Sequence, residues 1–555
     1  MDRSDPTPLA FRGDSFASPR PNRRTLVKGV AWSAPVLAAA TTAPALAASS
    51  PTGQCYPAGT LFDAQARGRL LSGAIGGINL DAVAEAAGVH AEAFEGTPNA
   101  ASHTVMNPLN VTALSALELQ LTGLGDTLSD LLSGLTDVNV GAVNQYATAH
   151  AAAEVESDAE VGGAGTVSDN GVLDLANADG GSAPALGTLS LYNILNQLTG
   201  TGVADVVNNI TQLDLEIGAL GGLATMNSLC VDPHISDTDS ETALSRSYVL
   251  ASLGLDVASP LVGGVLTAIP QSLAVDTDDL WALINSIPGL GPLLSGIGRN
   301  LLTATVTIDR AQLTDPIPNT ENPALQIALE DGQITIDVAS LLGGAYTGNV
   351  SPWLNELGSN TRLFVDAGVP GDALTSFIND LSTTLLDRIK NLLHIEVRGG
   401  TPVTNTRILH ISGSLADFLN GDADVDLIGI NLGSLLLNPL LEGIGDLVDN
   451  LVAGLFAEGG AVATALQAVN ALLSSLFDVL EGVLAITVNA QNTASGSMPS
   501  YYQSVTTEGR YDVAALHVEA LGVVNLLNLS LGRGSVGENT ARVTGPANRG
   551  IQLPF

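Results

Sequence analysis

The sequence predicts an α+β protein built from repeated units of amphipathic helices followed by antiparallel strands. It should be rich in β-structure, with several helical hairpins; a mainly β fold is the alternative. Two observations support this prediction. Runs with apolar residues three and four positions apart are followed by segments of polar and apolar alternation. The strands after the helices begin near Leu213, Ala304, Leu393 and Ala485, at intervals of 91, 89 and 92 residues. Such spacing indicates either duplication of one module or chance recurrence.

The clearest unit spans Ala373 to Gly413. From Leu374 to Leu393, apolar residues recur at steps of three and four, which places them on one face of a helix of about five turns. Alternating residues follow, break at Gly399-Gly400-Thr401-Pro402, and resume before Gly413. A helix and two strands that each have one apolar side can cover one another, so we expect one compact unit.

Residues 1–47 are predicted to be a signal peptide. Arg23 and Arg24 precede an uncharged, alanine-rich stretch, which favours the twin-arginine route; an ordinary secretory signal is the alternative. Small residues suited to signal peptidase cleavage after Ala47 are Ala45, Ala47 and Ala48.

The first half of the remaining chain divides into a lead and two units. Residues 48–104 are expected to be β-rich, with strands near Ala64–Leu71 and Val89–Phe94. Residues 105–258 should hold units 1 and 2. Elements expected there are a helix at Thr127–Leu135, strands at Val138–Ala149 and Leu213–Ile217, a hairpin turn at Asp169-Asn170-Gly171, and one return strand near Ser247–Val257.

Units 3 and 4 are assigned to residues 259–345 and 346–435. Unit 3 should contain a helical part over Leu280–Leu302, kinked by its prolines, and the strand that begins at Ala304. A hairpin with the turn Asp331-Gly332 should follow. Unit 4 is the one from Ala373 to Gly413.

Unit 5 is assigned to residues 436–540, and residues 541–555 to a C-terminal tail. Leu440–Phe456 and Val462–Leu484 predict two amphipathic helices, joined at Glu458-Gly459-Gly460 as a helical hairpin. A strand from Ala485 and one or two long strands within Val513–Leu531 should follow.

The charge of the chain excludes one class of partner. Without the leader's six basic and three acidic residues, 14 of the 20 basic and 53 of the 56 acidic residues remain, a net charge near −39. Such a surface repels phosphate backbones and anionic headgroups, so we expect no nucleic-acid partner. We also expect no transmembrane segment in the mature chain.

Cys55 and Cys230 are the only cysteines in the sequence. Export places them in an oxidising compartment, which favours one disulfide between them; two buried free thiols are the alternative.

The sequence shows no catalytic constellation. It has no Gly-x-Ser-x-Gly elbow and no His-Glu-x-x-His spacing, and the histidines in predicted strands, among them His394, His410 and His517, are read as satisfied or solvent-facing. Gly532–Gly537 fits a Gly-x-Gly-x-x-Gly string, but no helix follows it, so a strand ending in a glycine-rich turn is expected. We therefore expect neither an enzyme nor a cofactor.

One acidic segment resembles the start of a calcium loop. Asp422, Asp424 and Asp426 have the required spacing, but Leu427 and Gly433 occupy positions where such a loop needs glycine and glutamate. These three aspartates are the candidate metal ligands, and a solvated acidic loop is the alternative.

Four short strings resemble the actinobacterial choice-of-anchor G proteins: Ala66-Arg67-Gly68-Arg69-Leu70-Leu71-Ser72-Gly73, Asn107-Pro108-Leu109-Asn110-Val111, Val140-Gly141-Ala142-Val143-Asn144-Gln145-Tyr146-Ala147 and Leu529-Ser530-Leu531-Gly532-Arg533-Gly534-Ser535-Val536-Gly537. The resemblance implies an exported surface protein and supplies no catalytic residues. The sequence ends without a Leu-Pro-x-Thr-Gly sorting motif, which puts covalent attachment to the wall in doubt.

These observations favour an exported, non-enzymatic cell-surface or extracellular protein of structural or adhesive type. Its expected partners are a cell-wall or surface glycan or other surface proteins. A secreted carrier of lipids or other amphiphiles, with a groove between helices and a curved sheet, is the alternative. A hydrolase is the third hypothesis. It ranks last because nothing in the sequence places a nucleophile, base or metal.

Overall fold

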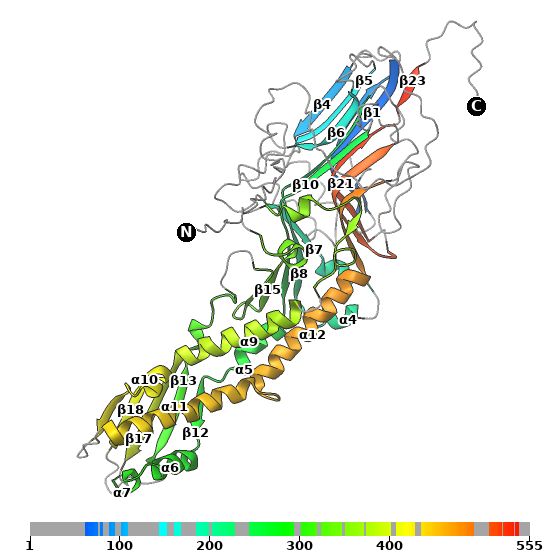
Figure 1. The fold of residues 1–555 in the computed structure, drawn as a ribbon. Helices are drawn as coiled ribbons and strands as arrows, with labels where there is room; N and C mark the ends of the chain where they lie inside the picture. Colours follow the sequence, from blue (N-terminus) through cyan, green and yellow to red (C-terminus); the bar gives the residue numbers. More distant parts are fainter. Residues whose placement is uncertain are drawn as a thin grey trace, which may run out of the picture. The chain divides into compact units, whose positions relative to one another are not determined.

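The computed structural model describes residues 61–542, except for 76–77, 81–87, 95–101, 109–143, 152–159, 168–184, 199–201, 228–243, 294–300, 319–322, 347–349, 371–372, 401–406, 428–433, 493–509, 524–525 and 538. All of them belong to one compact unit, Thr42–Phe555. The fold is α+β, as predicted, and the described strands form four antiparallel sheets (Figure 1).

The largest sheet has eight strands and joins distant parts of the chain. Its order is β16-β20-β21-β22-β1-β2, with β3 and β23 also paired to β1. The strands are β1 (Leu61–Ile75), β2 (Ile78–Asn79), β3 (Val89–Ala93), β16 (Thr361–Arg362), β20 (Leu484–Gln491), β21 (Tyr511–Ala520), β22 (Leu527–Val536) and β23 (Thr540–Arg542). The predicted strands near Ala64–Leu71 and Val89–Phe94 are confirmed, and the stretch Val513–Leu531 forms two strands.

A five-stranded sheet packs face to face on this one. Its order is β10-β9-β6-β5-β4, and β5, β6 and β9 contact β1 and β22. Its strands are β4 (Ser102–Pro108), β5 (Asn144–His150), β6 (Glu160–Val167), β9 (Leu220–Asn227) and β10 (Leu244–Leu250).

Glycine and alanine let the two sheets approach closely. A Cβ on Gly534 would lie 2.2 Å from the carbonyl oxygen of Ala164 across the interface, and one on Gly222 would lie 2.3 Å from that of Gly532. The buried cluster between the sheets is mostly alanine. The Gly- and Ala-rich strings of the sequence therefore form a thin sandwich core, where larger side chains have no room.

Two further five-stranded sheets each bury one face under helices. The first has the order β14-β15-β11-β8-β7 and contains β7 (Ala185–Ser190), β8 (Gln212–Gly218), β11 (Leu253–Ala258), β14 (Leu325–Ala328) and β15 (Gln333–Asp337). The second has the order β12-β13-β17-β18-β19 and contains β12 (Ser272–Val275), β13 (Thr303–Ile308), β17 (Leu393–Gly400), β18 (Arg407–Ser414) and β19 (Asp424–Leu427).

The longest described helices are α9 (Ala373–Leu392), α11 (Ser434–Phe456) and α12 (Ala461–Gly482). The shorter ones are α3 (Tyr192–Leu195), α4 (Val203–Val207), α5 (Pro260–Ala268), α6 (Thr277–Ser286), α7 (Leu290–Leu293), α8 (Val338–Gly343) and α10 (Leu415–Asn420), with 3₁₀ turns η5 (Arg310–Gln312) and η6 (Trp353–Asn355). The unit that begins with α9 is confirmed, since β17 and β18 follow it as expected and pair with each other.

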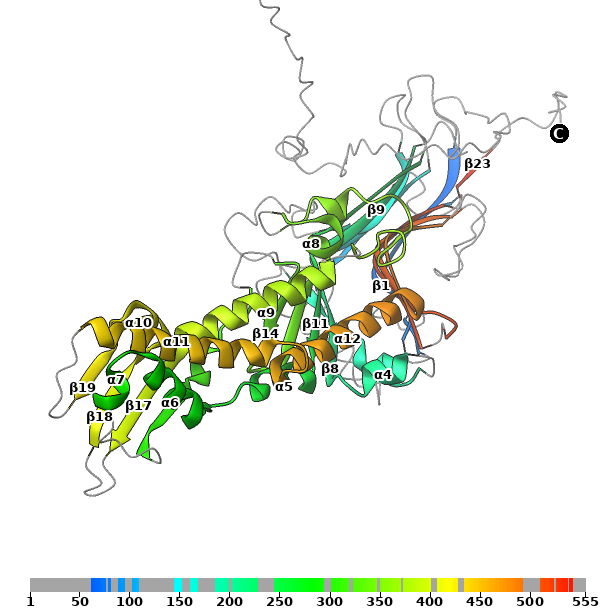
Figure 2. The ribbon, with the colours of Figure 1, turned by 60° about the horizontal axis from the view of Figure 1, so that its bottom comes forward.

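The predicted helical hairpin of α11 and α12 is wrong. The two helices follow one another in nearly the same direction, and α9 lies beside both (Figure 2). Each helix already has another partner for its apolar face: α11 packs on α6, α10 and β12, and α12 packs on α4, α5 and β20. Gly459, with a φ of 82°, ends the first helix without folding the second back onto it.

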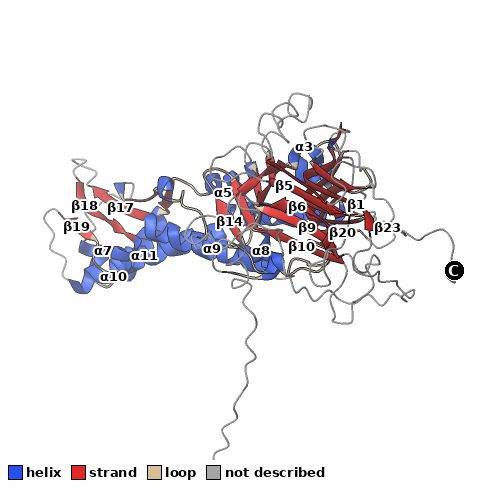
Figure 3. Ribbon diagram, turned by 90° about the horizontal axis from the view of Figure 1, so that it is seen from above, coloured by secondary structure: helices blue, strands red, loops and turns tan. Residues whose placement is uncertain are grey.

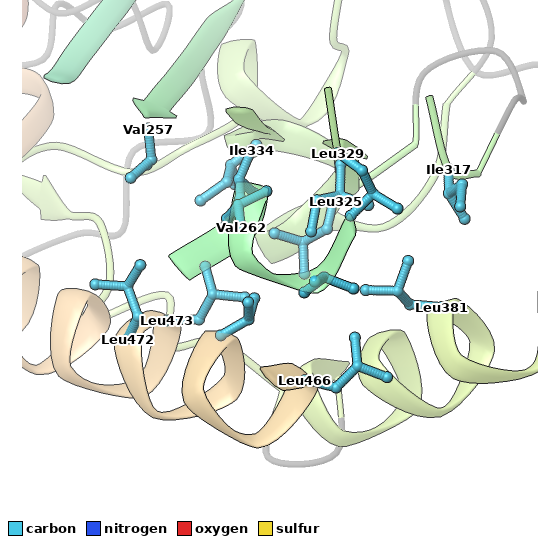
Figure 4. Packing of buried hydrophobic residues seen from close by; sticks show 14 of the residues in the cluster. Val257, Val262, Ile317, Leu325, Leu329, Ile334, Leu381, Leu466, Leu472 and Leu473 are labelled. Atoms are coloured by element: carbon cyan, nitrogen blue, oxygen red, sulfur yellow. The ribbon is translucent and has the colours of Figure 1, made fainter. Parts of the chain in front are cut away.

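The helices and sheets enclose one large apolar core. Leu466, Leu472 and Leu473 of α12 extend toward Val262 of α5 and toward Ile334 of β15 (Figure 4). These side chains are 0–4% exposed, so the space between helices and sheet is filled by the chain itself. Figure 3 shows α10 and α11 lying along one side of β17, β18 and β19.

Strand pairing crosses the segments assigned from the sequence. β13 of unit 3 pairs with β17 of unit 4, whereas the hairpin of β14 and β15, also in unit 3, extends the sheet of β8 and β11. The single return strand expected near Ser247–Val257 is wrong. The structure has β10 and β11 there, in different sheets, because the chain turns at Ala251 and Ser252.

One stretch of the described residues, Leu436–Gly482, is long and apolar enough to cross a membrane by length and composition. It comprises α11 and α12, whose apolar faces pack into the core. Core helices pass the same test, so the expected absence of a transmembrane segment stays a prediction.

Candidate functional surface

The sheet of β12, β13, β17, β18 and β19 has one face that no described helix covers. Burial alternates along β13 and β17, so every second side chain points away from the core. We call these side chains the open face: Ser272, Thr303, Thr305, Thr307, His394, Glu396, Arg398, His410, Ser412, Asp424 and Asp426.

Glu396 lies at the centre of the open face. Its Oε1 accepts hydrogen bonds from Arg398 Nε at 2.8 Å and lies 2.7 Å from His410 Nε2. Hydrogen bonding to His410 and then to Arg398 lowers the pKa of Glu396. The side chains of Arg398, Glu396 and His410 are 59%, 30% and 20% exposed, so the group meets solvent while its geometry is fixed.

The calcium candidates lie at the edge of this face. Asp424 and Asp426 belong to β19 and pair with Ser412 and His410, while Asp422 lies in the turn before the strand. An extended strand points Asp424 and Asp426 to the same side of the sheet, whereas an EF-hand loop wraps its ligands around the ion. Within the described residues, no group of three His, Cys, Asp or Glu side chains is arranged to hold a metal.

A second uncovered face belongs to the sheet of β8 and β11 and is acidic. Asp214, Glu216 and Asp256 lie on these neighbouring strands. Partial burial, followed by the charge and hydrogen bond of Asp256 and the charge of Asp214, raises the pKa of Glu216 to about 7. Glu216 therefore gains or loses its proton near neutral pH.

The eight-stranded sheet holds a buried Ser–His–Glu group. Ser530 Oγ lies 2.9 Å from His517 Nδ1, and His517 Nε2 lies 3.6 Å from Glu519 Oε2. Burial, followed by the charge of Arg533, holds the pKa of His517 well below its ordinary value. All three residues are at most 1% exposed, so a substrate cannot reach the Ser530 hydroxyl in this structure.

Asp512 of β21 organises a second buried polar group. It accepts hydrogen bonds from Arg510 Nε at 3.1 Å, from Arg533 and from the Ser535 hydroxyl. Burial alone would raise the pKa of Asp512, but Arg533, Arg510 and the Ser535 hydroxyl together outweigh it and hold the pKa below its ordinary value. This carboxylate is therefore charged inside the protein.

A hollow of about 200 Å³ lies beside the end of α12. Its lining is mostly apolar and comprises Gln197, Leu198, Val203, Gly482, Val483, Leu521 and Val523. Ligand pockets usually enclose about 300–1,000 Å³, so this hollow is small for an amphiphile.

Several predictions fall outside the described residues. These are the export signal at Arg23 and Arg24, the cleavage residues Ala45, Ala47 and Ala48, the cysteines Cys55 and Cys230, the helix at Thr127–Leu135 and the turn at Asp169-Asn170-Gly171.

Comparison with known families places most of the chain in a family of unknown function. The family described as "Domain of unknown function (DUF8394)" matches residues 66–537, most of the chain. The chain belongs to the DUF8394 family. No curated protein and no solved structure matches it. The DUF8394 match begins in β1 and ends directly after β22, two strands that pair with each other in the eight-stranded sheet.

Sequence reasoning missed the charged groups of this DUF8394 protein. The sequence shows Arg67 and Arg69 only as part of a short string, because Arg510, Asp512 and Arg533 lie more than 440 residues away. A usable signal was present: basic residues are rare here, yet two alternate in β1 and a third lies in the glycine-rich segment of β22.

Proposed function

We propose that this protein is exported and acts without catalysis at the cell surface or outside the cell, as a structural or adhesive protein. The open face is the observation that carries the proposal. It presents hydroxyl, imidazole, carboxylate and guanidinium groups in rows across the strands, and helices pack on the opposite face of the same sheet. Neighbouring strands lie about 4.8 Å apart and alternate residues about 7 Å apart, which suits repeated contacts with an extended polymer.

The chemistry of the open face favours a hydroxylated polymer such as a surface glycan. Thr303, Thr305 and Thr307 form one row of hydroxyl groups, and Glu396 and Ser412 supply acceptors on the next strands. Each hydroxyl group both donates and accepts hydrogen bonds, as do the hydroxyl groups of sugars. The leader and the resemblance to choice-of-anchor G proteins support an exported location. The strongly acidic composition supports solubility outside the cell.

Co-sedimentation with insoluble cell-wall polysaccharide tests the proposal. The double variant Thr305→Val and Thr307→Val keeps the shape and strand preference of both residues but removes two hydroxyl groups. We expect the wild-type protein to sediment with the polysaccharide and the double variant to remain largely in solution. Thr335→Val, on the other uncovered sheet face, is the matched control and should bind as the wild type does. Equal binding by all three proteins, or binding by none, would contradict the assignment.

The carrier of amphiphiles remains a second proposal, because a broad apolar layer separates the helices from the sheets (Figure 4). The described side chains fill that layer, so a lipid would have to part α12 from the sheet. Native mass spectrometry of protein from culture fluid tests this point. Mass that leaves on denaturation would support a carrier, and a bare polypeptide would count against it. A hydrolase is the third proposal, and would need Ser530 or another nucleophile to become accessible.

A further inference from the structure

The segment between α8 and α9 spans the edges of the two sheets that form the sandwich. Residues 351–367, which we call the strap, run from β10, an edge strand of the five-stranded sheet, to β20, which β16 separates from the edge of the largest sheet. β16 is part of the strap and pairs with two of the eight residues of β20. The strap therefore shields the edge of β20 with very little strand pairing of its own.

Side chains join the first part of the strap to β10. Asn355 Oδ1 accepts a hydrogen bond from the backbone N–H group of Leu250 at 3.0 Å, and Asn355 Nδ2 donates to the carbonyl oxygen of Leu250 at 2.9 Å. The hydroxyl oxygen of Tyr248 lies 2.7 Å from the carbonyl oxygen of Leu354 and 3.1 Å from that of Leu357. One amide side chain thus takes the place of a neighbouring strand at Leu250.

Backbone strain is concentrated where the strap meets β20. Among the described residues, the non-glycine residues with positive φ are Asn360 (58°), Phe364 (67°) and Asn489 (55°). The first two lie in the strap, and the N–H group of Asn360 donates to the carbonyl oxygen of Asn489 at 2.8 Å. Asparagine tolerates this conformation, but it is unfavourable for a bulky residue such as Phe364. Such strain persists only where the surrounding contacts enforce it.

Contacts with the apolar core hold Phe364 in this conformation. Leu363 and Phe364 are 0% and 4% exposed and belong to the main core cluster. The ring of Phe364 stacks on that of Phe477 in α12, with the ring centroids 6.0 Å apart. Arg362 donates through Nη2 to the carbonyl oxygen of Glu481, in the last turn of α12. The strap therefore fastens α12 to β20.

We propose that the strap is a latch that opens while the rest of the fold stays intact, and that its opening exposes the edge of β20 and the apolar layer between β20 and α12. Short strand pairing, attachment to β10 through side chains, and strain that opening relieves all favour separate opening. The latch thus controls access to the layer that a lipid must enter in the carrier hypothesis. Its opening does not depend on that hypothesis, because it can be measured without a ligand.

Hydrogen exchange of the full-length protein, measured by mass spectrometry with fragmentation that resolves single amides, tests the proposal. The amides of Asn360 and Leu363 both donate to β20. In the wild type they should exchange about tenfold faster or more than the paired amides of β21, because the latch opens more often than the whole protein unfolds. Equal protection of the strap and of β21 would overturn the proposal, since global unfolding exposes both together.

Two substitutions at Phe364 separate the ring contact from the backbone strain. Phe364→Ala removes the stacked ring but keeps an unfavourable backbone, so the strap amides should exchange about tenfold faster than in the wild type, or more. Phe364→Gly removes the same ring and relieves the backbone, so its strap amides should exchange more slowly than those of Phe364→Ala. Val365→Ala, at a neighbouring position that is 42% exposed, is the matched control and should exchange as the wild type does.

Fluorescence of the neutral apolar probe Nile red reports whether the open latch exposes the apolar layer. Emission should increase in Phe364→Ala while the β21 amides remain as protected as in the wild type. Unchanged strap exchange in Phe364→Ala would show that the ring does not hold the strap. Equal acceleration of strap and β21 amides would show that the strap opens only with the whole protein. Unchanged emission despite faster strap exchange would show that no apolar layer is exposed. Each of these three results would overturn the proposal.

Discussion

Arg246 of β10 donates a hydrogen bond through Nη1 to the backbone carbonyl of Asp512 in β21, 3.3 Å away. The same nitrogen lies 2.8 Å from the carbonyl oxygen of Asn492. One side chain thus links the two sheets of the sandwich at a place where both backbone acceptors are largely shielded from water. Burial lowers the pKa of Arg246 to about 10, against the opposing charges of Asp512 and Tyr511, so the group remains charged at neutral pH.

Replacing Arg246 with Met keeps most of the side-chain volume and removes these hydrogen bonds. The buried carbonyl groups of Asn492 and Asp512 would lose a donor, so the free energy of unfolding should fall by about 1–3 kcal/mol. Urea denaturation at pH 7 measures this change. Arg398→Met is the matched control, because Arg398 is 59% exposed and should change stability by less than about 0.5 kcal/mol. Equal effects of the two substitutions would contradict a special role for Arg246.

The thin sandwich core predicts that alanine substitution has opposite effects on stability at two glycines. Gly534→Ala should lower the free energy of unfolding by about 1–3 kcal/mol, because the new Cβ would lie 2.2 Å from the carbonyl oxygen of Ala164 and the sheets would have to separate. Gly454→Ala, in α11 with open space around it, should raise it by about 0.5–1 kcal/mol. Thermal unfolding of both variants shows whether each substitution raises or lowers the stability of the protein. A stabilising Gly534→Ala substitution would show that the sheets are farther apart than described.

Glu216 predicts a loss of stability as pH rises. Its pKa lies near 7 in the folded protein and near 4.5 in the unfolded chain. Between these values the unfolded chain releases the proton while the folded protein keeps it, so the free energy of unfolding falls as pH rises from about 4.5 to about 7. Glu216→Gln should flatten this part of the profile. Urea midpoints measured across the same range test it, and parallel profiles for wild type and variant would refute the assignment.

The low pKa of His517 predicts that the free energy of unfolding falls as pH decreases, which is the opposite dependence to that of Glu216. Because its pKa in the folded protein lies well below 6.5, the unfolded chain takes up a proton first as pH falls below about 6.5, and stability is lost in that direction. His517→Gln should reduce this loss, whereas His394→Gln, at an exposed position, should leave it unchanged. Stability measured between pH 7 and pH 5 distinguishes the two. If His517→Gln loses as much stability as the wild type between pH 7 and pH 5, groups other than His517 cause the loss.

Local elements of the fold could be predicted because their signals are local. The apolar face of α9 and the alternation in β17 are visible within a few turns or residues, and the structure confirms both. The pairing of β13 with β17 could not be predicted in this way, because it depends on which apolar faces the helices leave uncovered. The predicted hairpin of α11 and α12 failed for the same reason, since each helix found another partner.

The polar sites were harder to predict than the elements. The open face combines residues from five strands, and its members, such as Thr305 and His410, are ordinary residues for exposed strands. The pairing of β1 with β22, the first and nearly the last described strands, places Arg69 opposite Arg533. Only the scarcity of basic residues in the sequence pointed to these charged groups.

The pairing of β1 with β22 also sets an order of events during folding. Residues 61–75 cannot complete their sheet until residues 527–536 have been made, so an interior strand of the largest sheet must wait for almost the whole described chain. Contacts between residues so distant in sequence form slowly, because a long loop must close before they contribute. The exposed edges of β1 would meanwhile be open to wrong pairing. A chain that stops before β22 should therefore aggregate rather than fold into a shortened version of this protein.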